Sequence, residues 1–264
     1  MEEGRWRGWD NAEIYDRFVR ERGIYRWLNQ QLIERADLAR ARRVLDLGCG
    51  TGATTASCLA VLPVESEVVG IDASAEMIEV ARAQTLDPRA RFLVGDAGAA
   101  AELVEGPFDR AVSNAAFWQF PARPRVLAAL ARLLEPGGRF VFNVPAERVA
   151  TGGTPLHPFQ VALARAIGDR QGAPFVQNST PFDPAALRED VRPFGLEVVA
   201  CERLEWEGAQ AELMELMQIP AMIAPITQGL NDEEKRAAIG DAKAATDPGE
   251  RVRVPWLYLA VRRR

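Results

Sequence analysis

The stretch VLDLGCGTG, residues 44–52, decides the fold of this chain. A short apolar run ends there in glycines at alternate positions, Gly48, Gly50 and Gly52. Glycine accepts positive φ values and lets a ligand lie directly against the backbone, and such a turn between a strand and a helix forms a ligand site in open α/β folds. We therefore expect a strand, a glycine turn and a helix N-terminus that together bind a cofactor.

The composition narrows the class of protein. The chain has 264 residues, of which 48% are hydrophobic, enough for one large domain or for one domain with a lid. A net charge of −5 argues against nucleic acid or an anionic membrane as a partner. No stretch reaches the ~18 to 20 apolar residues of a membrane span, and the charged N-terminus lacks the apolar segment of a secretory signal. Three scattered cysteines, without a CxxC pair, predict no disulfide framework and no metal site, so we expect a cytoplasmic protein.

Short apolar strands alternate with helices over residues 44–144. The pattern predicts strands at 44–47, 67–72, 91–96, 108–114 and 139–144, and helices at 54–62, 74–86 and 124–134. Strands joined by helices of this length form parallel βαβ units. The prediction is an α/β fold with a doubly wound sheet covered by helices on both faces, to which further strands at 196–206 and 251–263 are added.

The remaining segments predict covers around this sheet. Residues 1–40 read as an N-terminal helical cover, and residues 41–264 as the main domain with lid-like insertions at about 146–182 and 208–246. The second insertion is rich in methionine, which suits an adaptable apolar lid, the packing of that lid, or a contact within a homodimer. The sequence leaves lid and dimer interface open.

The spacing of the glycine turn fits two kinds of cofactor. Gly48, Gly50 and Ala53 satisfy the dinucleotide fingerprint, and Asp72 follows Gly52 by 20 residues, where a ribose-binding acid is expected. NAD and an adenosine-containing sulfonium are therefore not separated by spacing alone. A dinucleotide-dependent oxidoreductase and a catalytically silent cofactor-binding protein stay as alternatives.

Five motifs in order carry a family resemblance: VLDLGCGTG, VVGIDAS, FLVGDA, FDRAVSNAAFW and LEPGGRFVFNVP. This set resembles the class I S-adenosylmethionine-dependent methyltransferases, strongly over residues 40 to 145 and weakly over the last two predicted strands. The resemblance implies a seven-stranded, mostly parallel, Rossmann-like sheet whose last strand is antiparallel. It also implies S-adenosylmethionine as the cofactor and methyl transfer as the reaction.

The resemblance assigns cofactor contacts to the strand ends. Residues expected to line the methionine and ribose portions are Asp46, Gly48, Cys49 and Gly50, with Cys49 as a small residue and not a nucleophile. Asp72 would accept hydrogen bonds from both ribose hydroxyls. The expected adenine contacts are Ala73, Met77, Asp96 and Ala97, and Asn114 is expected beside the transferred methyl group.

The sequence says less about the site that binds the methyl acceptor. The implied reaction is direct attack on the methyl carbon by an acceptor oxygen, nitrogen, carbon or sulfur, for which the protein mainly aligns the reactants. We expect a small, partly apolar acceptor, of the kind found in natural-product metabolism. The only histidine, His157, is the candidate base or acceptor contact. The candidate pocket residues are Tyr15, Tyr25, Phe117, Trp118 and Met217.

Overall fold

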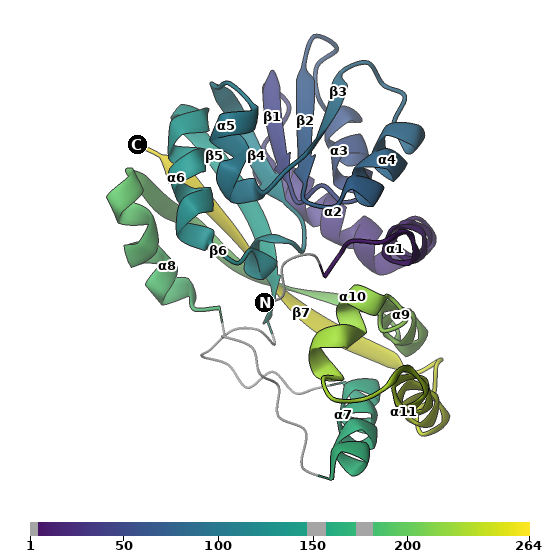
Figure 1. Ribbon diagram of the computed structural model, residues 1–264. Helices are drawn as coiled ribbons and strands as arrows, with labels where there is room; N and C mark the ends of the chain where they lie inside the picture. The colour runs from purple at the N-terminus through teal and green to yellow at the C-terminus, as the bar shows by residue number, and fades with distance from the viewer. Residues whose placement is uncertain (1–4, 147–156, 173–181) are drawn as a thin grey trace.

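The computed structural model describes residues 5–146, 157–172 and 182–264. Within these ranges, seven strands form one sheet in the order β3-β2-β1-β4-β5-β7-β6 (Figure 1). β7 runs antiparallel to β5 and β6, whereas the pairs among β1 to β5 are parallel. The predicted α/β fold, with its antiparallel last strand, is confirmed. Most of the predicted insertion at 146–182 lies outside the described residues.

The strands and helices follow the predicted alternation. The strands are β1 Arg43–Leu47, β2 Glu67–Asp72, β3 Ala90–Val94, β4 Phe108–Ser113, β5 Leu134–Pro145, β6 Leu196–Ala209 and β7 Arg251–Arg263. The helices before β5 are α1 Trp9–Glu21, α2 Gly23–Ala36, α3 Ala53–Leu59, α4 Ala75–Gln84, α5 Ala100–Leu103 and α6 Arg123–Leu133. The later helices are α7 Pro158–Gln171, α8 Pro184–Val191, α9 Gln210–Leu216, α10 Pro220–Ile223 and α11 Asp232–Ala244.

Helices cover both faces of the sheet, and successive strand residues point to opposite faces. In β1, Val44 belongs to the apolar cluster that includes α2 and α3, whereas Leu45 belongs to the cluster that includes α6 and α8. Both residues have no exposed surface. This burial on two faces explains why the strands read as continuous apolar runs.

Three local features differ from the prediction. β5 begins at Leu134, earlier than the strand predicted at 139–144, and residues 135–138 form an irregularity across which its pairing with β4 moves from Leu134 to Arg139. The segment 208–246, predicted as one lid-like insertion, contains three helices, α9, α10 and α11, and Pro220 begins α10. A short 3-10 turn at Ala97–Ala99 and α5 follow β3, where no element was predicted.

Helices α7, α9, α10 and α11 gather at the far end of β6 and β7, beyond the parallel part of the sheet (Figure 1). They share a separate apolar cluster to which Phe159 of α7, Met214 of α9 and Ala238 of α11 belong. None of the helices in the described ranges has both the length and the apolar character that a membrane span needs.

The N-terminal helices are joined to this helical group. The Arg22 guanidinium donates to both carboxylate oxygens of Glu215, at 2.5 and 2.8 Å. A carboxylate oxygen of Glu212 accepts from the backbone N–H of Ile24 at 2.9 Å, at the N-terminus of α2. The backbone N–H of Ala221 donates to the Asn11 side chain at 2.8 Å. Helices α1 and α2 and the segment that contains α9 and α10, far apart in sequence, are therefore in direct contact.

Candidate active site

The glycine turn after β1 leaves no room for side chains. Gly48 and Gly50 have φ values of 71° and 54°. A Cβ atom on Gly48 would lie 2.6 Å from the Ala116 Cβ, and one on Gly50 would lie 3.2 Å from a ring carbon of Tyr15. The turn thus needs glycine both for its backbone conformation and for the close approach of its neighbours.

Asp72, at the end of β2, is held in place by two backbone donors. Its Oδ2 accepts from the Gly50 N–H and its Oδ1 from the Ser74 N–H, both at 2.9 Å. Burial raises the pKa of Asp72, and these donors oppose the rise because they stabilise the charged form. Each carboxylate oxygen keeps a second lone pair. Asp72 can therefore accept two hydrogen bonds from a diol while the glycine turn fixes its orientation.

A cavity of about 620 Å³ lies against this turn. Its volume falls within the range of about 300 to 1,000 Å³ typical of small-molecule and cofactor sites. Ten of the residues predicted from the sequence line it: Tyr15, Tyr25, Gly48, Gly50, Asp72, Ala73, Met77, Asp96, Ala97 and Asn114. The ends of β1, β2, β3 and β4 therefore meet at one cavity, as expected for parallel strands whose carboxyl ends share one edge of the sheet.

Asp46 and Cys49 lie behind the turn and do not line this cavity. Asp46 has no exposed surface, and its Oδ2 accepts from the Thr55 hydroxyl at 2.7 Å. Burial, together with the nearby Asp72 charge, raises the pKa of Asp46 to about 7. Cys49 packs in a small cluster with Phe92, and burial raises the pKa of its thiol. These two residues support the turn from behind.

A second cavity, of about 110 Å³, adjoins the first. The two cavities have Tyr25, Ala115 and Gln119 in common. The smaller cavity is enclosed by side chains of α2, α7, α9, α10 and β7, and Trp118, His157 and Met217 of the predicted residues line it. An apolar chamber thus opens beside the cofactor-sized cavity.

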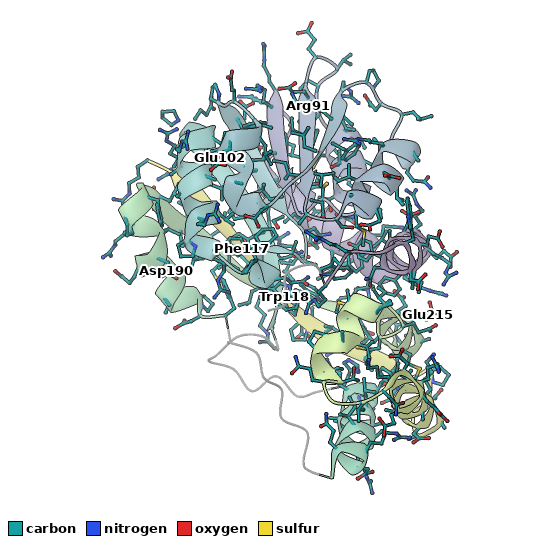
Figure 2. All side chains as sticks on the ribbon, viewed as in Figure 1. Arg91, Glu102, Phe117, Trp118, Asp190 and Glu215 are labelled. Atoms are coloured by element: carbon teal, nitrogen blue, oxygen red, sulfur yellow. The ribbon has the colours of Figure 1, made fainter. Side chains whose placement is uncertain are left out.

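Phe117 and Trp118 are neighbours with different surroundings. Figure 2 shows both between the sheet and the helical group at its far end. Trp118 lines the smaller cavity, whereas Phe117 has no exposed surface and its ring centroid lies 4.3 Å from that of Phe142. Phe117, predicted as a pocket residue, is part of the core beneath the pocket.

His157 begins α7 as its N-cap. Its Nδ1 accepts from the backbone N–H of Gln160 at 3.3 Å, and the Gln160 side chain accepts from the His157 backbone N–H, which completes a capping box. Burial lowers the pKa of His157 to about 4, so the ring is neutral near pH 7. Because Nδ1 is the acceptor in this cap, the ring proton is on Nε2. The ring can therefore donate from Nε2, and abstraction of a proton would require the other tautomer.

Buried asparagines fix the wall between the two cavities. The Asn29 Oδ1 accepts from Thr54 Oγ1 at 2.7 Å and from Asn114 Nδ2 at 2.8 Å, and Asn143 Nδ2 donates to Asn114 Oδ1 at 2.7 Å. The Asn143 Oδ1 then accepts from the backbone N–H of Ala115 at 2.6 Å. Ala115 has a φ of 54°, which is uncommon for a residue with a Cβ. The asparagine network therefore holds a strained residue at the point shared by the two cavities.

Two tyrosines cover the glycine turn. The ring centroids of Tyr15 and Tyr25 lie 5.6 Å apart in an edge-to-face arrangement. Burial is the main cause that raises the pKa of both, to about 12 for Tyr25. Both hydroxyls therefore stay protonated near neutral pH and do not act as bases there.

Several residues that line the two cavities were not predicted from the sequence. Arg5, Trp6, Arg7, Gln119 and Arg125 line the larger cavity, and Trp256 of β7 lines the smaller one. The Trp6 Nε1 donates to the Gln119 side-chain oxygen at 2.9 Å, across 113 residues of sequence. Contacts of such long range leave no local pattern. In the described part of the chain, His, Cys, Asp and Glu side chains form no metal-binding group.

The fold and the site define a class of protein. A doubly wound sheet with an antiparallel β7, a glycine turn after β1 and a carboxylate at the end of β2 that faces a cofactor-sized cavity are the features of a Rossmann-like methyltransferase. The profile of the family described as "Methyltransferase domain" matches residues 44–138. This chain belongs to the class I S-adenosylmethionine-dependent methyltransferases, whose cofactor is S-adenosylmethionine.

Curated relatives are named as methyltransferases of a small molecule. A trans-aconitate 2-methyltransferase from Methylobacterium radiotolerans is 34% identical over 194 residues, which cover 71% of this chain and 69% of the relative. One from Deinococcus radiodurans is 44% identical over 104 residues, which cover 39% of this chain and 38% of the relative. The matched part of the chain thus spans between 38% and 69% of these two relatives.

A solved structure has a similar fold at low sequence identity. Phosphoethanolamine N-methyltransferase 2 from Haemonchus contortus, in complex with S-adenosyl-L-methionine, superposes with a TM-score of 0.59 at 17% identity. The match covers 97% of this chain and 57% of the other. At this identity the likeness concerns the fold alone.

Proposed function

We propose that this chain transfers a methyl group from S-adenosylmethionine to a small, partly apolar molecule bound in the chamber of about 110 Å³. One observation carries the proposal: the cofactor-sized cavity and the apolar chamber share Tyr25, Ala115 and Gln119. Cavities that share lining residues place their ligands side by side, which is the arrangement that direct transfer requires.

The residues of the larger cavity fit the cofactor. Asp72 presents two free acceptor positions to a diol, and the bare Gly50 backbone allows close approach. Met77, in the helix after β2, and Asp96, just after β3, line the part of the cavity that we assign to the adenine. S-adenosylmethionine supplies an activated methyl group when bound. The chain's own residues then orient the acceptor, and the cover formed by α1, α2, α9 and α10 limits access of water.

Among the described residues that line the two cavities, the carboxylates Asp72 and Asp96 are assigned to the cofactor, and no other side chain is a ready base. The Tyr15 and Tyr25 hydroxyls stay protonated, and the Nδ1 of His157 is occupied by its capping bond. We therefore propose that the chain works mainly by alignment, with an acceptor that is already nucleophilic or that loses its proton to water. A role for His157 as the base is less well supported, because it would require the other ring tautomer.

A second class of acceptor is favoured by a separate observation. Arg5, Arg7 and Arg125 line the larger cavity, and the relatives described above are named for trans-aconitate, a polycarboxylate. Guanidinium groups bind carboxylates well. A carboxylate acceptor held by these arginines is therefore the alternative to an apolar acceptor in the chamber.

The experiment follows release of S-adenosylhomocysteine with two acceptor panels, one of small aromatic and aliphatic ketones, phenols and amines, and one of di- and tricarboxylates that includes trans-aconitate. Turnover with the first panel supports the proposal, and turnover with the second alone supports the carboxylate alternative. Gly50→Val, which fills the cofactor cavity, gives the background. Binding of S-adenosylhomocysteine without turnover in either panel would point to the silent cofactor-binding protein.

A further inference from the structure

The wall of the smaller cavity includes a tryptophan whose buried indole N–H is unpaired among the described residues. Trp256 of β7 lines this cavity and is 7% exposed. Its indole Nε1 has no hydrogen-bond partner among the described residues. Buried N–H groups in native proteins are nearly always paired, and an orphan requires an explanation. A ligand oxygen in the cavity would supply the missing acceptor.

A second donor belongs to the same cavity. His157 lines it, and its Nδ1 accepts the capping bond from the Gln160 backbone. The ring proton is therefore on Nε2, which makes His157 a donor to whatever it faces, like the indole of Trp256. Two of the residues around the chamber thus offer N–H groups from separate elements, β7 and the start of α7.

The rest of the wall is uncharged. The described residues that line the chamber include no Arg, Lys, Asp or Glu. Most are aliphatic or methionine side chains, among them Leu163, Ile167, Leu213, Leu216, Met222 and Val254. A carboxylate group in this chamber would lose its hydration without gaining a cationic partner, which is strongly unfavourable. The arginines that could pair with a carboxylate line the other cavity.

We infer that the chamber binds the acceptor through an uncharged oxygen, a carbonyl or an ether, that accepts hydrogen bonds from Trp256 Nε1 and His157 Nε2, with the apolar body of the molecule against the aliphatic wall. This inference rests on the proposed function, because it assigns the chamber to the acceptor. The chamber volume, about 110 Å³, is below the roughly 150 Å³ of a closed cavity that holds benzene, so one ring would fill the chamber and a larger molecule would extend toward the adjoining cavity. The substrate class is therefore a neutral aromatic or cyclic compound of about one ring at its bound end.

The test uses two model compounds of the same shape, acetophenone and ethylbenzene, of which only acetophenone has the oxygen. Affinities are measured by ligand-observed NMR titration on the full chain, with and without saturating S-adenosylhomocysteine. We expect wild type to bind both compounds. Trp256→Phe is expected to weaken acetophenone about tenfold, because the ring keeps its packing but loses the N–H, and to change ethylbenzene by less than about twofold.

Two further variants separate the donor from structural effects. His157→Asn keeps a good N-cap for α7 but removes Nε2–H, so it is expected to weaken acetophenone several-fold and spare ethylbenzene. Trp27→Phe, a partly buried tryptophan that lines neither cavity, is the matched control and is expected to change neither affinity.

Three results would overturn the inference: no binding of acetophenone to wild type, equal loss of both compounds in Trp256→Phe, or competition of trans-aconitate with acetophenone. S-adenosylhomocysteine binding is measured on the same samples. If S-adenosylhomocysteine does not bind, the result counts against the proposed function. If it binds and any of the three results is observed, only the assignment of the chamber to the acceptor is rejected.

Discussion

The two adjoining cavities differ in how the chain builds them. The larger one is made chiefly by the ends of four neighbouring strands and the turns that follow them, and it is rich in backbone donors, carboxylates and arginines. The smaller one is made by side chains of helices and of β7 that come from distant parts of the sequence, and it is mostly apolar. Cofactor binding thus depends on local turn chemistry, whereas acceptor choice depends on packing that can change residue by residue.

The largest effect is expected from the glycine turn. Gly50→Val places a β-branched residue at a φ of 54°, within contact distance of Tyr15, and fills the space next to Asp72. We expect cofactor affinity to fall more than about 100-fold, because both the ligand space and the backbone conformation are lost.

Calorimetry with S-adenosylhomocysteine checks this result. Gly229→Val is the control, because Gly229 also has a positive φ, 87°, but a Cβ there would meet no atom within 4 Å. It is expected to lose stability without losing affinity. Equal affinity in Gly50→Val and wild type would place the cofactor elsewhere.

A change in the shared wall tests both cavities at once. Asn143→Leu removes the acceptor of the Ala115 N–H and the donor to Asn114. Two buried groups left unpaired cost about 1–3 kcal/mol each, so we expect the free energy of unfolding to fall by about 2–6 kcal/mol and turnover to fall with it. Chemical denaturation and the methyl-transfer assay measure the two effects.

The network can be tested further with Ala115→Gly in the Asn143→Leu background. Glycine takes a positive φ without strain, so part of the lost turnover should return even though the hydrogen bonds do not. A double variant no more active than the single one would mean that the conformation of Ala115 has no role in the reaction.

Asp72 tests the polar side of the comparison. Asp72→Ala is expected to weaken S-adenosylhomocysteine by about 1.5–3 kcal/mol, the range for hydrogen bonds to a charged group. The Kd of ethylbenzene, the model compound that binds in the chamber, should change by less than about twofold from wild type, because Asp72 does not line the chamber. Unchanged cofactor affinity in a folded variant would remove Asp72 from the site.

Filling the chamber tests the apolar side. Ala164 of α7 lines it, and Ala164→Trp should lower turnover about tenfold or more while cofactor affinity stays within about twofold, because Ala164 does not line the larger cavity. Ala237→Trp, on the exposed face of α11, is the control and should leave both unchanged. A full rate in Ala164→Trp would show that the acceptor binds outside the chamber.

The smallest effect concerns the dependence of stability on pH. Asp46, behind the glycine turn, and His157, at the smaller cavity, contribute to it with opposite signs. Asp46 has its pKa raised to about 7, so between about pH 4 and pH 7 the folded state holds a proton that the unfolded state has lost, and stability falls as pH rises. His157 has its pKa lowered to about 4, so between about pH 4 and pH 6.5 the unfolded state holds the extra proton, and stability rises with pH.

In wild type these two contributions oppose each other over about pH 4 to 6.5. Relative to wild type, the stability of Asp46→Asn should rise more steeply with pH and that of His157→Asn should fall, each by at most about 1.4 kcal/mol per pH unit. Urea denaturation across this range measures the slopes. Slopes identical in all three proteins would mean that neither group titrates with the shift described.

Much of the fold and of the cofactor site follows from sequence, because their causes are local. Gly48 and Gly50 are required by the backbone of a single turn, Asp72 ends a strand of continuous apolar residues, and Asn231 with Glu234 forms its capping box within one helical turn. Parallel strands then bring their carboxyl ends together without any further information. The sequence therefore suffices to place Gly48, Gly50 and Asp72 around one cavity.

Tertiary structure alone decided the rest. Cys49 and Gly50 are neighbours in one turn, yet Cys49 packs toward Phe92 and Gly50 lines the cavity. Phe117 and Trp118 likewise divide between core and chamber, and Trp256 reaches the chamber from the last strand. Which way a side chain points, and which residue it meets, depends on the packing of elements that are separated in the sequence, and no local periodicity records that.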